Sequence, residues 1–244
     1  MDEWFSHFLM QLGAEMYDEI QMLRDDYRAA MTTLHRQAGR LLHNKSKEVS
    51  VLDVACGTAM ATRSVFDKRA ATKQSFRFVG LDADHKLLEF AQSKWPSLTE
   101  KCADMVQAEI EERFDLILCS FAYHHVPDAQ KLQLCRNLRK WCKPGGDLLV
   151  LEICLAESQV HAYYEAVKAK LQRGQASDLC KRFLNWTMMP GDTSANTEWK
   201  VPQARLLKDF SEAGWELQES QRVWATPSLP PEAGCYYLHF RLSS

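Results

Sequence analysis

The sequence predicts an α/β fold built on a doubly wound, mostly parallel, Rossmann-like sheet. Short apolar runs alternate with helical patterns between residues 49 and 153, which is typical of parallel strands joined by right-handed crossover helices. Residues 114–119 are nearly all apolar, as expected of a strand that is covered on both faces. The first apolar run, residues 49–54, leads into a turn of small residues at 55–59, where the backbone can approach a ligand closely.

Residues 1–44 precede this alternation and have a helical pattern. Apolar side chains recur there every three or four positions, which describes one helix or two helices broken near Gly13 or at Asp25 and Asp26. Such a face packs against a core, closes over a site, or does both. We expect an N-terminal helical lid. The residues that form the stripe are Leu9, Leu12, Met16, Ile20, Leu23, Tyr27, Met31 and Leu34.

Residues 45–154 are expected to form the ligand-binding core of the sheet. The strands expected in this part are 49–54, 76–81, 114–119 and 147–153, and the helices between them are 61–70, 84–94 and 129–142. The Lys-Pro-Gly-Gly-Asp run at 143–147 predicts a turn before the last of these strands.

The strand rhythm stops between residues 155 and 200, so this segment is predicted to be a helical cap insertion. Residues 201–244 are expected to complete the core sheet. The elements expected in these two segments are helices at 157–172, 177–188 and 201–213 and strands at 215–220 and 236–242.

The composition excludes several classes of protein. The 244 residues are 46% apolar and 25% charged, which is ordinary for a globular chain, and the net charge of −2 gives no basic footprint for nucleic acid. No apolar run approaches the roughly 20 residues of a membrane span, and the N-terminus lacks the pattern of a signal peptide. The eight cysteines are scattered without metal-ligand spacing, so we expect reduced thiols, no metal and a cytoplasmic protein.

Four polar positions are expected at the carboxyl ends of successive strands, where open α/β sheets bind ligands. They are the turn that follows Asp53, then Asp82, Asp104 and residues 120–128. A carboxylate at Asp82 can accept both hydroxyls of a ribose, and one at Asp104 can accept an adenine amino group. Asp84 begins a helix and is equally well explained as its N-cap.

Together these motifs resemble the class I S-adenosylmethionine-dependent methyltransferases, in their small-molecule branch. The resemblance runs from about residue 49 to residue 242, with 155–200 matching only as a variable insertion. It implies a seven-stranded sheet whose last strand is antiparallel. The matching blocks are Val-Leu-Asp-Val-Ala-Cys-Gly-Thr-Ala at 51–59, Gly-Leu-Asp at 80–82, Ala-Asp at 103–104, Phe-Asp-Leu-Ile-Leu at 114–118, His-His-x-x-Asp at 124–128, Lys-Pro-Gly-Gly at 143–146 and residues 206–215.

The resemblance also implies S-adenosylmethionine as the cofactor and a role for each matching position. The methionine part would meet Asp53 and the turn, the ribose would meet Asp82, and Ser120 would lie near the transferred methyl. The family usually has glycine where Ala59 stands, so its methyl group is expected to weaken or tilt the cofactor. The cofactor-binding residues implied are Asp53, Ala55, Gly57, Thr58, Asp82, Ala83, Asp104, Met105 and Ser120.

The chemistry of the turn agrees with a sulfonium cofactor. A nicotinamide dinucleotide needs a glycine-rich pyrophosphate site, and Gly57 is the only glycine in the turn. S-adenosylmethionine carries no phosphate, and Asp53 suits its ammonium group. Arg24, Arg28 and Arg36 could reach the cofactor carboxylate, although solvated helix charges explain them more simply.

Catalysis of methyl transfer needs positioning of the acceptor and, for a phenol or alcohol, a base. His124 and His125 follow the fourth strand of the resemblance, next to the expected methyl, and one of them is the candidate base. The alternative is that the pair only orients its loop or packs on the cofactor. Tyr17 resembles the lid tyrosines of this branch and is a third catalytic candidate, or else a core residue.

The sequence therefore predicts a methyltransferase that acts on a small molecule at oxygen or nitrogen, as a monomer or homodimer, with no nucleic acid or membrane partner. Methylation of tRNA or protein is a weaker alternative, because the charge is near neutral and no Asn/Asp-Pro-Pro-Tyr-type motif follows residues 114–119. The third possible function is that of a protein that binds S-adenosylmethionine without transferring its methyl group. An aromatic acceptor pocket is expected from the insertion residues Tyr163, Tyr164, Phe183, Trp186, Met188, Met189 and Trp199.

Overall fold

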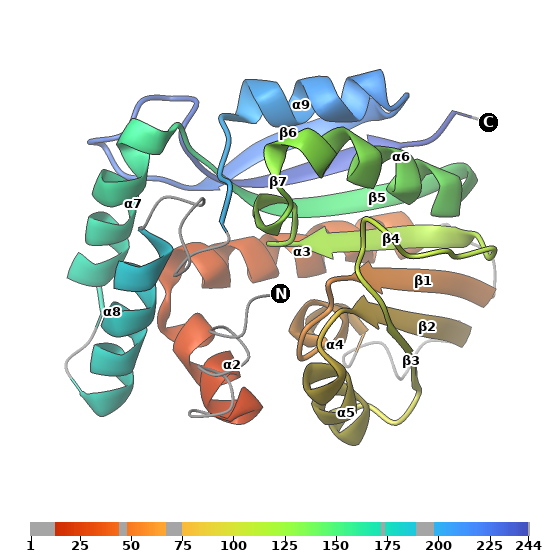
Figure 1. Cartoon of the computed structure of the whole chain (residues 1–244), viewed down its shortest axis with the longest axis horizontal. Coiled ribbons are helices and arrows are strands. Elements are labelled where there is room, and N and C mark those ends of the chain that lie inside the picture. The colour runs from red at the N-terminus through yellow and green to blue at the C-terminus, as the bar shows by residue number, and fades with distance from the viewer. Residues whose placement is uncertain (1–12, 44–47, 67–74, 172–173, 189–197, 244) are drawn as a thin grey trace.

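The computed structural model describes residues 13–43, 48–66, 75–171, 174–188 and 198–243. A seven-stranded sheet lies between two layers of helices, in the strand order β3-β2-β1-β4-β5-β7-β6 (Figure 1). Six of these strands run parallel to one another, and β7 runs antiparallel to them. The strands are β1 (Glu48–Val54), β2 (Ser75–Asp82), β3 (Leu98–Cys102), β4 (Phe114–Ser120), β5 (Cys142–Cys154), β6 (Glu216–Trp224) and β7 (Gly234–Arg241).

The helices divide between the two faces of the sheet because the strands alternate their side chains. Val49 and Val51 of β1 pack in one apolar cluster with α3, α4, α7 and α8, whereas Leu52 and Val54 pack in the other with α6 and α9. The helices are α2 (Ala14–Leu23), α3 (Asp25–His43), α4 (Met60–Phe66), α5 (His85–Lys94), α6 (Lys131–Trp141), α7 (Glu157–Ala169), α8 (Gln175–Thr187) and α9 (Gln203–Glu212), with two short 3-10 turns, η2 (Tyr123–His125) and η3 (Asp128–Gln130).

The N-terminal stripe forms two helices with the break at the predicted place. α2 ends at Leu23, α3 begins at Asp25, and Arg24 between them has an extended backbone. Ile20 of α2 is fully buried, and α2 packs against α3 and α8. Leu9 and Leu12 lie outside the described residues. Within the part of the chain that the structure describes, no helix has both the length and the apolar character to cross a membrane.

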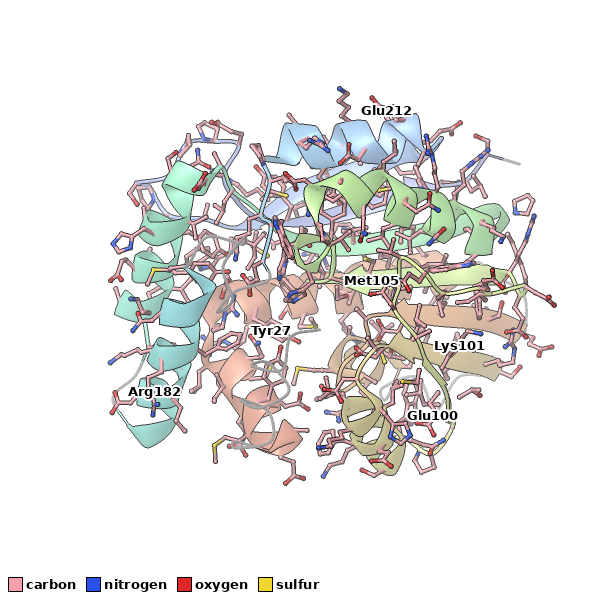
Figure 2. The ribbon with its side chains drawn as sticks, viewed as in Figure 1. Tyr27, Glu100, Lys101, Met105, Arg182 and Glu212 are labelled. Atoms are coloured by element: carbon pink, nitrogen blue, oxygen red, sulfur yellow. The ribbon has the colours of Figure 1, made fainter. Side chains whose placement is uncertain are left out.

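Two local predictions differ from the structure. β3 is absent from the predicted strands because it is an edge strand that pairs only with β2, and Leu98 is its one buried residue (Figure 2 shows Glu100 and Lys101 there). The turn predicted at 143–147 lies inside β5 as an irregularity, where pairing with β4 shifts between Phe114 and Leu116. Its glycines remain necessary because a Cβ on Gly146 would lie 2.6 Å from Cys142 Sγ.

Candidate active site

A cavity of about 370 Å³ lies at the carboxyl ends of the central strands, within the size range of small-molecule sites. Side chains from α2, α3, the strand ends, η2 and the cap segment line it; Tyr27 and Met105 face it from α3 and from the loop after β3 (Figure 2). The cavity brings together the three catalytic candidates and the nine cofactor-binding candidates from the sequence: Tyr17, Asp53, Ala55, Gly57, Thr58, Asp82, Ala83, Asp104, Met105, Ser120, His124 and His125.

The turn after β1 has a backbone that glycine adopts most easily. Ala55, Gly57 and Ala59 have φ angles of 52°, 53° and 56°, a left-handed conformation that costs an alanine about 1 kcal/mol. Ala59 is fully buried and packs in the apolar cluster beneath the turn, and it is not among the residues that line the cavity. Its methyl therefore strains the backbone and does not crowd the cofactor space, unlike the sequence-based expectation.

Asp82 closes β2 and organises this turn. Its Oδ2 accepts the Gly57 N–H at 2.7 Å, and its Oδ1 accepts the Asp84 N–H at 2.9 Å. Burial raises the pKa of Asp82. Asp84 is the N-cap of α5, since its carboxylate accepts the N–H groups of Lys86 and Leu87. Two neighbouring aspartates thus have different tasks, and only Asp82 faces the cavity.

Asp53 and Ser120 contribute buried polar atoms to the cavity wall. Asp53 is 2% exposed and accepts the Thr62 hydroxyl, but none of the described ion pairs includes it. Burial raises its pKa to about 7. The Ser120 Oγ is buried and has no hydrogen-bond partner among the described residues. A ligand that carries an ammonium group and polar atoms at this point would satisfy both side chains.

The loop after β3 forms another part of the cavity wall. Asp104 Oδ1 accepts the N–H groups of Val106 and Gln107, at 2.8 and 3.1 Å. Asn137 of α6 donates to the carbonyls of Met105 and Val106, at 3.3 and 2.7 Å. Asn137 therefore fixes the loop that would hold an adenine, and nothing in the local sequence of α6 indicated this.

His124 lies at the cavity wall in η2 and is paired with a carboxylate that the sequence analysis missed. Its Nδ1 lies 2.5 Å from Glu152 Oε1, and its backbone N–H donates to Glu152 Oε2 at 3.2 Å. Glu152 is 1% exposed and is the one charged residue among the apolar residues 148–154 at the carboxyl end of β5. A charged residue inside an apolar strand was the available signal, because such a residue needs a buried partner.

The electrostatics of this pair favour a neutral imidazole. Burial, together with the cations of Lys200, Lys131 and Arg24, lowers the pKa of His124 well below its usual value. Burial raises the pKa of Glu152 to about 7. A carboxylate at Nδ1 holds the proton on that nitrogen, so the lone pair lies on Nε2. His125 lies beside it, with ring centroids 4.3 Å apart, and burial lowers its pKa too.

Phe121 follows Ser120 at the end of β4 in a strained conformation. Its φ is 55°, which is unusual for a bulky side chain. The ring stacks on Tyr27 of α3 at 5.0 Å, and the Phe121 N–H donates to the Leu151 carbonyl at 2.7 Å. Both rings line the cavity. These contacts keep Phe121 in its strained conformation at the end of β4, beside the cavity. Backbone strain of this kind is common at functional sites.

Among the three arginines considered for the cofactor, only Arg24 lines the cavity. It is 4% exposed and donates to Asp26 and Gln21. Arg28 pairs with Asp25, and Arg36 contacts Gln221 at an exposed position. The solvated-charge interpretation therefore fits Arg28 and Arg36 but not Arg24.

The N-terminal helix α2 is joined directly to the turn after β1. Asp18 accepts the Thr58 hydroxyl at 2.5 Å and pairs with Arg63 at 3.3 Å. Tyr17 contacts Phe183 edge to face, and burial raises its pKa to about 12, so its hydroxyl keeps its proton at neutral pH. Tyr17 is consequently suited to donate a hydrogen bond rather than to act as a base.

The cap contributes an aromatic wall opposite the sheet. Tyr164, Phe183, Glu198 and Trp199 line the cavity. Tyr163 is buried and donates to Asp26 at 2.8 Å, and Met188 packs on the core beneath. The side chain of Trp186 and all of Met189 lie outside the described residues.

Three potential metal ligands also meet in the cavity. The ligand atoms of His124, His125 and Glu198 lie within 4.8 Å of one another. Two imidazoles and a carboxylate can bind a divalent metal. Here, however, Glu152 engages His124 and Lys200 pairs with Glu198.

Comparisons with known proteins agree with this geometry. The methyltransferase domain family matches residues 51–146. An uncharacterised methyltransferase of Schizosaccharomyces pombe is 27% identical over 130 residues, which are 48% of this chain and 43% of that protein. The PKS-NRPS hybrid synthetase cheA of Chaetomium globosum is 30% identical over 127 residues, 49% of this chain and 3% of that protein. The chain thus spans less than half the length of these curated relatives.

Solved structures share the fold at low sequence identity. An S-adenosylmethionine-dependent methyltransferase from Clostridium acetobutylicum has a TM-score of 0.64 at 13% identity, covering 95% of this chain and 98% of that one. The CurJ carbon methyltransferase has a TM-score of 0.62 at 15% identity, covering 93% and 58%. The N-methyltransferase NodS of Bradyrhizobium japonicum, bound to S-adenosyl-L-homocysteine, has a TM-score of 0.57 at 16% identity, covering 94% and 99%.

The seven-stranded sheet with one antiparallel strand, and the cavity at its carboxyl edge, define a class I methyltransferase fold. Residues 51–146 match the methyltransferase domain family, and the fold is shared with solved S-adenosylmethionine-dependent methyltransferases.

Proposed function

We propose that this chain transfers the methyl group of S-adenosylmethionine to a small molecule, with His124 as the general base. The observation that carries the proposal is the buried pair of His124 and Glu152 in the wall of the same cavity as Asp53 and Asp82. One end of the cavity fits the cofactor, and the other is aromatic and contains a base.

Three groups of residues would bind three different parts of the cofactor. Asp53 and Ser120 would hold the ammonium and the polar end of methionine. Among the described residues, the buried Asp53 carboxylate takes part in no ion pair and the Ser120 hydroxyl has no hydrogen-bond partner. Asp82 would accept the ribose hydroxyls, and Asp104 with Met105 would hold the adenine. When bound, the cofactor supplies a methyl group already activated by its sulfonium.

His124 and Glu152 would act on the acceptor. The Nε2 lone pair would take the proton of the attacking group, whose electron pair would form the bond to the methyl carbon while the bond from that carbon to sulfur breaks and leaves a neutral thioether. Glu152 then stabilises the imidazolium that forms, much as a buried carboxylate does for the histidine of a catalytic triad. Burial keeps the imidazole neutral at pH 7 with its Nε2 lone pair available, and the Glu152 carboxylate at Nδ1 offsets the cost of the charge that the ring gains on accepting a proton.

The attacking atom is proposed to be oxygen or nitrogen, with carbon as the second candidate. Carbon is kept as the second candidate because the chain is similar to the CurJ carbon methyltransferase and matches part of the PKS-NRPS hybrid synthetase. An acidic C–H next to a carbonyl needs a positioned base, as a phenol does, whereas an amine needs only its lone pair. A tRNA or protein acceptor is disfavoured by the net charge of −2.

A cytoplasmic site of action, as a monomer or homodimer, completes the proposal. It is supported by the cysteines, which are all free and mostly buried.

The test is an assay with methyl-labelled S-adenosylmethionine against phenols, amines and β-ketoacyl thioesters, with tRNA and a peptide mixture as macromolecular controls. We expect label in a small acceptor and loss of transfer in His124→Ala. His125→Ala should retain more activity, because Glu152 is bonded to the ring and the backbone N–H of His124. Binding of the cofactor without transfer to any acceptor would instead support a protein that only binds S-adenosylmethionine.

A further inference from the structure

Lys131, the first residue of α6, has a side chain that is 0% exposed. Its ammonium donates to three backbone carbonyls, those of Tyr123 at 2.9 Å, Val126 at 2.7 Å and Trp199 at 2.8 Å. An ammonium has three N–H donors, so these three carbonyls use its whole capacity. The side chain acts as a bound cation around which three backbone segments gather.

Two of those carbonyls bracket the histidines. Tyr123 precedes His124, and Val126 follows His125, so the ammonium closes η2 from both ends. The third belongs to Trp199, whose N–H also donates to the His124 carbonyl at 2.6 Å. The loop that carries the base and the wall that carries Trp199 are therefore joined twice, once directly and once through Lys131.

Burying the Lys131 ammonium costs folding free energy, so its presence calls for a functional explanation. Burial of an ammonium is unfavourable, and a well-packed apolar side chain in such a place is often neutral or stabilising. Here the charge is offset by the carbonyls, by the face of the Tyr123 ring at 4.4 Å and by Asp128 at 3.7 Å. What an apolar side chain could not supply is the fixed direction of three carbonyls beside the cavity.

We propose that Lys131 is a positioning residue for methyl transfer, whose ammonium sets the backbone of η2 and of Trp199 so that His124 Nε2 faces the acceptor. The inference rests on the proposed role of His124 as the base. Lys131 itself is not among the residues that line the cavity, so it acts through the backbone and does not touch the acceptor.

The test compares Lys131→Met, which keeps the length of the side chain without its donors, with Lys140→Met on the exposed side of the same helix. Calorimetry with S-adenosyl-L-homocysteine should give dissociation constants within threefold of wild type for both variants. The single-turnover rate of methyl transfer should fall at least 100-fold in Lys131→Met alone. An unchanged rate in Lys131→Met would overturn the inference.

A second readout does not depend on finding the acceptor. Nuclear magnetic resonance of the His124 ring and of the η2 amides should show shifted signals in Lys131→Met and wild-type signals in Lys140→Met. Wild-type signals in Lys131→Met would overturn the inference even if the proposed function holds. Conversely, a wild-type protein without transferase activity would refute the proposed function while this readout still tests the position of His124.

If Lys131→Met does not fold, as judged by thermal unfolding, Lys131→Gln serves in its place, because an amide can still donate to two of the carbonyls. We expect this variant to bind S-adenosyl-L-homocysteine normally and to transfer at an intermediate rate. Full activity of the folded Gln variant would contradict the need for the third carbonyl contact and thus the inference.

Discussion

His124 Nδ1 and Glu152 Oε1 lie 2.5 Å apart in the interior of the protein. The contact joins the turn after β4 to the carboxyl end of β5, and these two strands are parallel neighbours. Because the carboxylate accepts from Nδ1, the imidazole offers Nε2 to the cavity. This contact is the basis of the proposal that His124, and not the adjacent His125, accepts the proton.

Glu152→Gln should lower the methyl-transfer rate on the order of 100-fold or more, because an amide no longer stabilises the imidazolium or fixes the tautomer. The affinity for S-adenosyl-L-homocysteine should stay close to that of wild type. Transfer kinetics and calorimetry check both, with the exposed Glu157→Gln as the control. A Gln variant with a wild-type rate would remove Glu152 from the mechanism.

We predict that cofactor affinity depends on pH through the ionisation of Asp53. Burial raises its pKa to about 7, and only the ionised carboxylate attracts an ammonium group. Cofactor affinity should therefore rise with pH. Between pH 5.5 and pH 7 the ionised fraction of Asp53, and with it the association constant, should grow roughly tenfold. Calorimetry with S-adenosyl-L-homocysteine should show this rise in wild type and a flat profile in Asp53→Asn. A pH-dependence of the same size in both proteins would assign the titration elsewhere.

Substitution of Asp82 should change cofactor affinity, whereas substitution of Asp84 should change the stability of the fold. Asp82→Ala removes the proposed ribose contacts and the Gly57 hydrogen bond, so cofactor binding should weaken by about 1–3 kcal/mol. Asp84→Ala removes the N-cap of α5, so the free energy of unfolding should fall by about 1 kcal/mol while affinity changes little. Titration calorimetry and urea unfolding distinguish the two. The ribose role is refuted by an Asp82→Ala protein that binds normally.

Ala55→Gly should stabilise the protein by about 1 kcal/mol, because Ala55 is only half-buried and its φ of 52° suits glycine. The matched control is Ala91→Gly in the middle of α5, where the same change should destabilise by about 1 kcal/mol or more. Thermal unfolding checks both signs. Equal destabilisation in the two variants would mean that the turn is not strained.

The sequence allowed the prediction of elements with strong periodicity, and the residues missed are those whose role depends on distant partners. The break between α2 and α3 follows from Asp25 and Asp26, and the strand ends carrying Asp53 and Asp82 follow from local patterns. β3 was missed because its only buried residue, Leu98, leaves no apolar run.

The missed site residues belong to contacts between remote segments. Glu152 meets His124 across 28 positions, and Lys131 meets Trp199 across 68. Local patterns predict which face of an element is buried, but they do not predict which buried polar groups become partners. The packing of β4, β5 and the cap determines that pairing.

The most direct test of the account is a crystal structure of the protein with S-adenosyl-L-homocysteine bound. We predict the ribose hydroxyls on Asp82, the amino group beside Asp53 and the sulfur facing the side of the cavity that holds His124. A nucleoside bound elsewhere, or a sulfur turned away from His124, would contradict the account.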